Sequence, residues 1–193
     1  MGKYIGYIRL YGIGGFLCLF IQKIRKVLFR RYTTTYYALF KKLTAEIDPA
    51  HLPAYRTLTW EDFQAAAAQH PADFDEQTMQ RIEQHLQRPE FFYYGVYEEN
   101  RLLCYAALSL QYNTFLGERN VEKFAYLFDD YTLPPYRGAG WHRKMVAIRE
   151  YEAKKQGKNV VFAYVGTYNR ASLKGFQRAG FFVRYKLTFQ KKS

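Results

Sequence analysis

A run of prolines, glycines and basic residues at Leu133–Lys144, LPPYRGAGWHRK, carries the clearest chemical signal in the sequence. Two adjacent prolines end a preceding strand because they remove backbone donors, and Gly138 and Gly140 permit positive φ angles. Apolar residues at helical spacing then predict a helix from Trp141, whose first N–H groups have no partner inside the helix. The sequence therefore predicts a turn that points backbone donors at a ligand.

Cations surround this expected helix start. Arg137, Arg143 and Lys144 add positive charge to the unpaired donors, which favours a diphosphate over a single carboxylate as the bound group. No Lys-Ser or Lys-Thr pair follows the glycines, so the run is not a nucleoside-triphosphate loop, and residues 138–140 alone do not form a dinucleotide fingerprint. The competing interpretation is a purely structural strand–turn–helix junction.

A second segment, NRASLKGFQRAGF at Asn169–Phe181, follows an expected strand and opens an expected helix. The stretch TLPPYRGAGWH resembles the strand–loop–helix signature of the GNAT-type N-acyltransferases, V-x-P-x-Y-R-G-x-G-x-G/A. The second segment resembles their N-x-x-A/S-x-x-x-Y-x-x-x-G-F motif, and the two occur in the family's order. The resemblance covers about Arg56–Phe189 and leaves residues 1–45 outside it.

The resemblance implies an α/β fold, a GNAT-like mixed sheet that opens between its fourth and fifth strands, with an acyl coenzyme A in the gap. Those strands would be residues 122–133 and 159–165. It also implies that the amides of residues 138–143 hold the pyrophosphate, and that the backbone of residues 131–133 pairs with pantetheine. The expected cofactor-binding residues are Tyr131, Thr132, Leu133, Arg137, Gly138, Ala139, Gly140, Trp141, His142, Arg143, Asn169, Ser172, Lys174 and Phe176.

The chemistry implied by the resemblance is direct attack of a primary amine on a thioester. Such a reaction needs a base for the amine, a backbone N–H for the oxyanion and a proton donor for the departing thiolate. Asp129 matches a strand position where some family members carry an acid facing the substrate, so we expect it to be the base, directly or through water. The competing interpretation is a solvated acid or the partner of a nearby arginine. Strand alternation turns Asp130 to the opposite face, where a structural role is expected.

The proton donor to the leaving sulfur is not the residue that the family commonly uses. Phe176 stands where the family commonly has the tyrosine that protonates the leaving sulfur, and phenylalanine has no proton to give. Tyr168 and Tyr164 are the expected catalytic substitutes, with Tyr131 as a further candidate. We expect His142 to lie near phosphate, with direct proton transfer as the alternative.

Positive charge is concentrated at the amino-terminal end. The net charge is +12, yet residues 1–42 hold nine basic and no acidic side chains, which leaves 20 basic and 17 acidic residues elsewhere. The longest uncharged apolar run, Leu10–Ile21, has 12 residues and is too short to span a bilayer. Apolar residues recur at helical spacing in this segment and predict a cationic amphipathic helix. These apolar residues are Leu17, Phe20, Ile21, Ile24, Val27 and Leu28.

We expect residues 1–32 to bind an anionic membrane surface, with packing on the chain's own domain or on a partner protein as alternatives. The run lacks a small-residue cleavage site, and Gly6 occupies the position where a myristoylation signal needs Ser or Thr. The expected location is therefore cytoplasmic, at the inner face of the membrane. Binding of RNA or ribosomes through the basic end is the third alternative, and it would show a steep salt dependence.

Length and composition limit the number of domains and the kinds of site that the chain can hold. A chain of 193 residues with 49% hydrophobic and 19% aromatic residues fits one globular domain with an appendage. Two distant cysteines without a CxxC pair and four histidines without ligand spacing predict neither a disulfide framework nor a metal site. We divide the chain into residues 1–45, a basic amphipathic helix with a lead-in strand, and residues 46–193, the GNAT-like acyltransferase domain.

Hydrophobic periodicity and turn residues predict the order of the elements. Strands are expected at residues 33–43, 55–58, 122–133, 159–165 and 181–189, with a hairpin at 91–113. Helices are expected at 59–69, 75–87, 141–156 and 172–179.

The expected function is transfer of an acetyl or other acyl group from coenzyme A to a primary amine of a lipid, an amino sugar or a peptide. One alternative is a GNAT-like protein that binds coenzyme A or a partner without turnover. The other is the RNA- or ribosome-associated protein.

Overall fold

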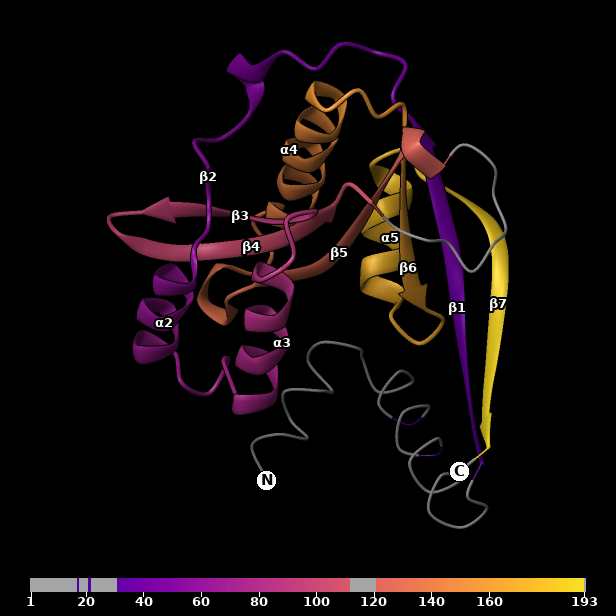
Figure 1. Cartoon of the computed structure of the whole chain (residues 1–193), viewed down its shortest axis with the longest axis horizontal. Coiled ribbons are helices and arrows are strands. Elements are labelled where there is room, and N and C mark those ends of the chain that lie inside the picture. Colours follow the sequence, from indigo (N-terminus) through magenta and orange to yellow (C-terminus); the bar gives the residue numbers. More distant parts are fainter. Residues whose placement is uncertain (1–16, 18–20, 22–30, 112–120, 193) are drawn as a thin grey trace. The chain divides into compact units, whose positions relative to one another are not determined.

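The computed structural model of this chain describes residues 17, 21, 31–111 and 121–192. Its strands are hydrogen-bonded in the order β2-β3-β4-β5-β6-β1-β7, a mixed sheet that carries helices (Figure 1). This architecture confirms the predicted α/β fold class. The helix predicted near the amino terminus lies outside the described residues, apart from Leu17 and Ile21, which are helical.

Contacts divide the chain into two compact units, a larger one of residues 42–162 and a smaller one of residues 1–41 with 163–193. Strand β6 (Val160–Gly166) contributes to both units. The contact-based division differs from the predicted boundary after residue 45, which stays a prediction.

Local sequence signals start the two adjacent helices of the larger unit. Helix α2 (Trp60–Gln69) follows Thr59, whose hydroxyl accepts a hydrogen bond from the Asp62 N–H while the Asp62 carboxylate accepts one from the Thr59 N–H. This reciprocal capping box satisfies two otherwise unpaired donors. Helix α3 (Glu76–Leu86) follows Asp75, which caps the first turn with its carboxylate.

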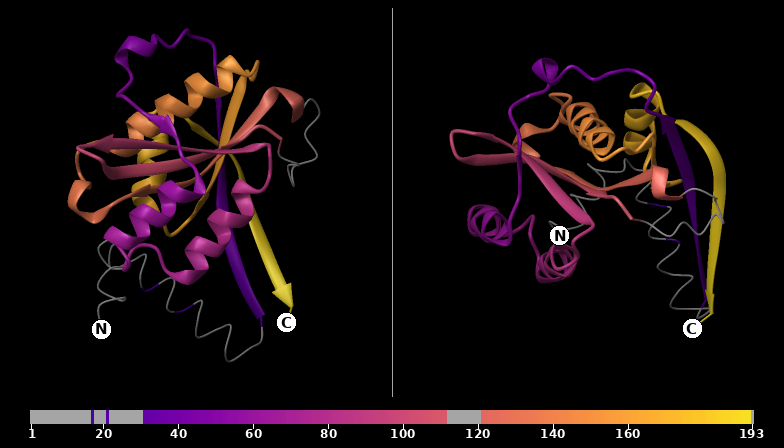
Figure 2. Two further views of the ribbon diagram at one scale, coloured as in Figure 1. Left: turned by 60° about the vertical axis from the view of Figure 1, so that its left-hand side comes forward. Right: turned by 45° about the horizontal axis from the view of Figure 1, so that its top comes forward.

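Aromatic side chains fill the core beneath these two helices. The Phe63 ring stands edge-on to Tyr93 and to Tyr105, with 5.2 Å between centroids in both pairs. Phe74 stacks on Tyr105 at 5.8 Å. Helices α2 and α3 cover one face of the sheet in this unit, and α4 (Trp141–Lys155) covers the other (Figure 2).

The predicted hairpin is confirmed. Strands β3 (Phe91–Glu98) and β4 (Arg101–Ser109) are joined by Glu99 and Asn100, which have φ angles of 47° and 61°. Two successive positive φ angles are the pattern of a tight hairpin turn whose twist matches that of the strands. The short strand β2 (Arg56–Thr57) pairs with the outer side of β3.

Strand β5 (Phe124–Thr132) leads into the glycine-rich turn. Its residues 126–132 pair antiparallel with β4, and its residues 124–126 pair in parallel with residues 160–162 of β6. Strand β5 then continues for six more residues beyond this register. The predicted opening of the sheet between these two strands stays a prediction.

In the smaller unit, the first and last strands of the fold lie side by side. Strand β1 (Arg31–Lys42) pairs antiparallel with β7 (Phe182–Lys192), as Figures 1 and 2 both show. The predicted helix of this unit is α5 (Arg170–Arg178), which starts two residues earlier than expected because Asn169 is its cap. The backbone N–H of Thr167, just after β6, donates to the Thr35 carbonyl at 3.0 Å.

The described residues show neither a membrane-spanning helix nor a cluster of metal ligands. In the part of the chain that the structure describes, no helix combines the length and the apolar character needed to cross a bilayer. Among the same residues, no group of three His, Cys, Asp or Glu side chains gathers as a metal site.

Candidate cofactor and catalytic site

The glycine-rich turn has the predicted backbone geometry. A short 3-10 helix at Pro134–Tyr136 follows β5, and Gly138 and Gly140 then have φ angles of 88° and 77°. Gly140 is the N-cap of α4. A methyl group at either glycine would meet no atom within 4 Å, so these positions need glycine for the backbone conformation, and the space beside them is open.

The turn lies just before helix α4, and this position leaves its backbone N–H groups without partners in the helix. Residues 138–141 precede or open α4, so the helix offers their N–H groups no carbonyl four residues back. Arg143 differs from the prediction, because its backbone N–H donates to the Gly140 carbonyl at 3.1 Å and only its side chain remains for a phosphate. Leu133 also differs, since its N–H donates to the Leu103 carbonyl at 3.0 Å and is not available to pantetheine.

Arg137 holds the turn against the end of β5. Its Nε donates to the Thr132 carbonyl at 2.9 Å, and its Nη2 lies 3.1 Å from the Tyr131 hydroxyl. The Tyr131 hydroxyl in turn donates to Asp73 Oδ1 at 2.6 Å, and burial together with this carboxylate raises the pKa of Tyr131. The guanidinium of Arg137 therefore has a structural task beside any contact with phosphate.

A buried ion pair lies between β5 and α4. Arg149 is fully buried and donates to both carboxylate oxygens of Asp130. Its other donors reach the carbonyls of Met145, Ala107 and Phe128 at 3.1 to 3.3 Å. This arrangement satisfies a buried charge that would otherwise be costly. It supports the structural role expected for Asp130.

Acid is expected to destabilise the protein through His142, whose Nε2 lies 3.9 Å from Asp130 Oδ1. Burial lowers the pKa of His142 below the ordinary value of 6.5; Asp130 opposes this shift and Arg149 adds to it. Between the lowered folded pKa and 6.5 the unfolded chain binds a proton that the folded chain does not. The contribution of His142 to the free energy of unfolding is therefore fully present above this pH window, and it is lost as the pH falls through the window.

Urea unfolding at about pH 7.5 and about pH 5.5 measures this effect on either side of the window. We expect His142→Gln to reduce the difference between the two pH values. His51→Gln, at an exposed histidine, is the matched control. Equal pH dependence in the wild-type protein and His142→Gln would show that another group is responsible.

Strand β5 carries one extra residue where it faces β4. Residues 128 and 131 lie opposite residues 107 and 105, so Asp129 and Asp130 share a single opposing position. Asp129 has a φ of 53°, a left-handed conformation that is uncommon for a residue other than glycine. Such a bulge leaves a backbone group outside the ladder and redirects the neighbouring side chains. The bulge therefore sets Asp129 and Asp130 apart from the regular alternation of β5.

The Asp129 carboxylate lies in a network that reaches α3. Its Oδ1 accepts a hydrogen bond from Arg81 Nη1 at 2.6 Å, and its Oδ2 accepts one from the Tyr93 hydroxyl at 2.7 Å. His85 Nδ1 lies 2.8 Å from the same hydroxyl and must be the donor, because the phenol proton points at Asp129. Burial raises the pKa of Tyr93, which keeps it a donor. The network shows Asp129 as an arginine partner, and its role as the base stays a prediction.

The second motif lies in the smaller unit. Asn169 caps α5, with its Oδ1 accepting a hydrogen bond from the Ser172 N–H at 3.1 Å. Lys174 is exposed on the same helix. The cap accounts for Asn169 and Ser172 by local structure, and their contacts with a cofactor stay predictions.

The aromatic candidates of this unit are packed against its own elements. Phe176 is 2% exposed, and its ring stands edge-on to Phe181 at 5.0 Å. The Tyr168 ring covers Gly166, where a methyl group would come within 2.5 Å of it. Tyr164 is half-buried within β6. Packing explains Phe176, and its contact with a cofactor stays a prediction, as do the catalytic roles of Tyr164 and Tyr168.

The profile of the acetyltransferase (GNAT) family matches residues 52–181, a range that includes the glycine-rich turn and the second motif. The chain belongs to this family. No curated protein sequence matches the chain.

Solved structures of GNAT proteins share the fold at low sequence identity. A protein from Novosphingobium aromaticivorans assigned to the GNAT family is 17% identical with a TM-score of 0.57, and the alignment covers 83% of this chain and 66% of that protein. The chain thus spans about two thirds of the length of this relative. The aminoglycoside 6'-N-acetyltransferase AAC(6')-Ih of Acinetobacter baumannii is 19% identical with a TM-score of 0.58, over 72% of this chain and 97% of the enzyme. The aminoglycoside enzyme AAC(6')-Iy, solved with a coenzyme A bisubstrate analogue, is 18% identical with a TM-score of 0.59. This alignment also covers 72% of this chain and 97% of the enzyme.

Several polar residues of this GNAT fold were not predicted from the sequence. Arg81, Tyr93 and His85 surround Asp129, and Arg149 binds Asp130. Arg81 and His85 are four residues apart and so share one face of α3, which is the one local signal that could have paired them. Arg81 and Tyr93 lie 48 and 36 positions from Asp129 in the chain, so no local spacing indicates their contacts with it.

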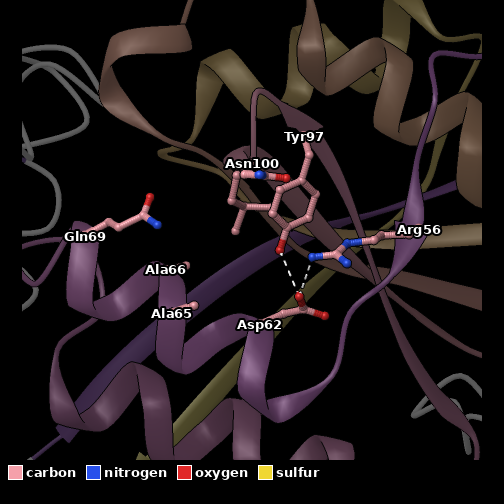
Figure 3. A pocket seen from close by; sticks show the side chains of 8 residues that line it. Arg56, Asp62, Ala65, Ala66, Gln69, Tyr97 and Asn100 are labelled. Carbon is pink, nitrogen blue, oxygen red and sulfur yellow. Dashed lines mark hydrogen bonds and ion pairs between the residues drawn. The ribbon is translucent and has the colours of Figure 1, made fainter.

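A cavity of about 230 Å³ in the larger unit lies away from the predicted residues, between α2 and the hairpin (Figure 3). At its rim the Arg56 guanidinium stacks over the Tyr97 ring at 4.2 Å and donates to Asp62 Oδ1 at 2.5 Å. The Tyr97 hydroxyl donates to the same oxygen at 3.3 Å. Its charged groups satisfy one another, so we assign this cavity no part in the reaction.

Proposed function

We propose that this GNAT protein is an N-acetyltransferase that moves an acetyl group from acetyl-coenzyme A to a primary amine. The observation that carries the proposal is the turn at the start of α4, where two glycines at φ of 88° and 77° leave the N–H groups of residues 138–141 without helical partners. The side chains of Arg143 and Lys144 add positive charge on the same turn of helix. Main-chain donors with nearby cations suit a diphosphate, and the family membership supports coenzyme A as the molecule that carries it.

The proposed reaction is one nucleophilic substitution. The amine nitrogen attacks the thioester carbonyl, the carbon–nitrogen bond forms, and the carbon–sulfur bond breaks as the amine loses a proton and the sulfur gains one. We place the donor for the developing oxyanion at the bulge of Asp129 and Asp130, because a bulge is where the ladder leaves a backbone group unused. Much of the rate enhancement would come from holding the two reactants in place.

Asp129 is the proposed base, directly or through water. It lies beside the bulge and is 9% exposed, with Arg81 and Tyr93 fixing its orientation. The proton donor to sulfur is assigned to Tyr164 or Tyr168, since Phe176 has no proton to give. A thiolate leaving without a donor from the protein is the competing possibility for this step.

Asp129→Asn is expected to lower kcat by about 100-fold, the lower end of the usual contribution of a general base. Coenzyme A affinity should be unchanged. Arg81→Gln is the control, because it removes the ion pair with Asp129 and keeps the Asp129 carboxylate. If both variants lose stability while Asp129→Asn keeps the wild-type kcat, Asp129 serves only as the arginine's partner.

The acceptor is proposed to be a small amine. AAC(6')-Ih and AAC(6')-Iy are aminoglycoside acetyltransferases by name, which supports amino sugars as the first acceptors to test. Peptide amines and the amine of a lipid headgroup are the other acceptors that we propose. The basic amino-terminal segment favours a lipid surface, and we propose that residues 1–32 hold the protein peripherally at the cytoplasmic face of a membrane.

Mass spectrometry of natively purified protein, followed by assay with acetyl-coenzyme A and a panel of amines, tests the proposed function. The panel should hold an aminoglycoside, glucosamine, a short peptide and phosphatidylethanolamine. Bound coenzyme A and an acetylated amine are the expected results. Bound coenzyme A without transfer to any amine would favour the binding protein without turnover, and no coenzyme A binding would overturn the proposal.

A further inference from the structure

The charges of the chain are segregated between its two units. The smaller unit, residues 1–41 and 163–193, contains 15 Lys and Arg residues and no Asp or Glu. The larger unit therefore holds 14 basic and 17 acidic residues. The positive charge of this protein thus belongs to the smaller unit as a whole, and it extends past the amino-terminal segment to α5 and β7.

The exposed large apolar side chains follow the same division. In the described residues they number five, all within the smaller unit, and each residue is 40 to 52% exposed. They are Leu17, Ile21, Phe182, Val183 and Phe189. Leu17 and Ile21 are helical and four residues apart, so they share one helix face. The other three lie on β7, which ends the sheet.

A register shift gathers most of the apolar side chains of β7 on one face. Val183 lies opposite Leu39 and Tyr185 opposite Ala38, so Arg184 is an extra residue in β7. Because cross-strand partners share a face, this bulge puts Phe182 on the same side as Tyr185, Leu187 and Phe189. Without it, the alternation of a strand would place Phe182 on the opposite side from these three.

Cationic groups border this face. The Arg184 guanidinium lies 5.2 Å from the centroids of both Phe40 and Tyr185. Tyr36 stands edge-on to Phe189 at 6.0 Å on the neighbouring strand. Lys186 is exposed at the next position of this edge strand, where its partner Tyr37 places it on the other side of the sheet. The result is a belt of partly exposed aromatic rings with basic side chains at its border, here called the β7 face (Phe182, Arg184, Tyr185, Leu187 and Phe189).

We propose that the β7 face binds the surface of an anionic lipid bilayer. Aromatic rings with Arg and Lys are the side chains enriched where a protein meets the headgroup region. Lipid is favoured over nucleic acid because the β7 face carries Leu187 between the exposed Phe182 and Phe189, apolar side chains that a bilayer can bury and a phosphate backbone cannot. The β7 face would then act together with the basic segment of residues 1–30, which enters the fold at the end of β1 that pairs with the carboxyl end of β7. This inference rests on the membrane association proposed above and is independent of acyl transfer.

Vesicle co-sedimentation of the full chain tests the proposal. The vesicles contain phosphatidylcholine alone or phosphatidylcholine with phosphatidylserine, and the variants are Arg184→Glu with Lys186→Glu and, separately, Phe182→Ser with Phe189→Ser. Each cation near an anionic surface contributes about fivefold to partitioning, so the charge variant should bind the anionic vesicles at least about 20-fold more weakly. The serine variant should lose about tenfold.

Matched controls separate surface position from net charge. Arg101→Glu with Lys123→Glu makes the same change in net charge on exposed residues of the larger unit and should bind vesicles far better than the β7 charge variant. Circular dichroism checks folding. Acetylation of a soluble amine, measured on the same samples, should be unchanged by the β7 substitutions, so a failure of the lipid proposal is distinguishable from a failure of the acetyltransferase proposal.

Four results would overturn the proposal. They are equal losses in the β7 charge variant and its control, unchanged vesicle binding in both β7 variants, binding of the wild-type protein to RNA but not to vesicles, and a dimer in sedimentation that the serine variant abolishes. In the second case, loss of binding on replacing Lys23 and Lys26 with Gln would assign the membrane contact to the amino-terminal segment alone. The fourth result would identify β7 as an interface between two copies of the chain.

Discussion

Gly140→Asp is expected to weaken coenzyme A binding by about 100-fold or more. The substitution puts a carboxylate on the N-cap of α4, in the open space where donors of residues 138–141 meet the proposed diphosphate. Two like charges about 4 Å apart near a protein surface repel strongly enough to produce a loss of this size. Calorimetric titration with coenzyme A measures it.

Gly140→Asn is the matched control for this experiment. Asparagine and aspartate have the same shape and both tolerate the left-handed conformation that Gly140 adopts at φ 77°. The two variants should therefore unfold at similar temperatures, and the asparagine variant should retain most of its affinity. Equal affinities in the two variants would mean that no anion binds at this turn, and the proposed function would lose its main support.

Asp130→Ala is expected to lower the free energy of unfolding by about 3–5 kcal/mol, because it leaves a buried charge without its partner. Arg149 is fully buried, and both carboxylate oxygens of Asp130 accept its hydrogen bonds. The carbonyls that Arg149 also reaches are neutral and cannot balance its charge. Urea unfolding followed by circular dichroism measures the change.

A surface ion pair supplies the control for this second prediction. Asp48 is 58% exposed and pairs with His51, so Asp48→Ala should cost less than about 1 kcal/mol. The double variant Asp130→Leu with Arg149→Met should recover part of the loss, because it removes both charges together. A cost for Asp130→Ala no larger than for Asp48→Ala would show that water reaches Arg149.

Much of the fold was predictable because its signals are local. Thr59 and Asp62, three residues apart, form the capping box that starts α2. Glu99 and Asn100 lie in a short polar stretch between two apolar runs, where the hairpin turns. The two glycines of the turn before α4 were predicted to have positive φ angles, and they do. Each of these features depends on residues within one turn of a helix or one tight turn of the chain.

The partners of the polar side chains could not be predicted in the same way. Asp129 was expected either to face a substrate or to pair with a nearby arginine. In the structure it binds Arg81 and Tyr93, which lie 48 and 36 positions away in the sequence, and no local pattern identified these two partners. The amide of Arg143 was expected to bind phosphate, but the first turn of its own helix takes it. Tertiary packing and helix geometry decided these contacts.

The sequence by itself determined the order of the elements, the glycine-rich turn and the family of this protein, because each depends on residue types at short fixed spacings. Only the tertiary structure decided that the first strand lies beside the last, that Arg149 is buried against Asp130, and that a bulge at Arg184 brings Phe182 to the face of Phe189. The physical reason is that these contacts join residues far apart in the chain. Their geometry depends on how strands pair and shift in register, which no local pattern specifies.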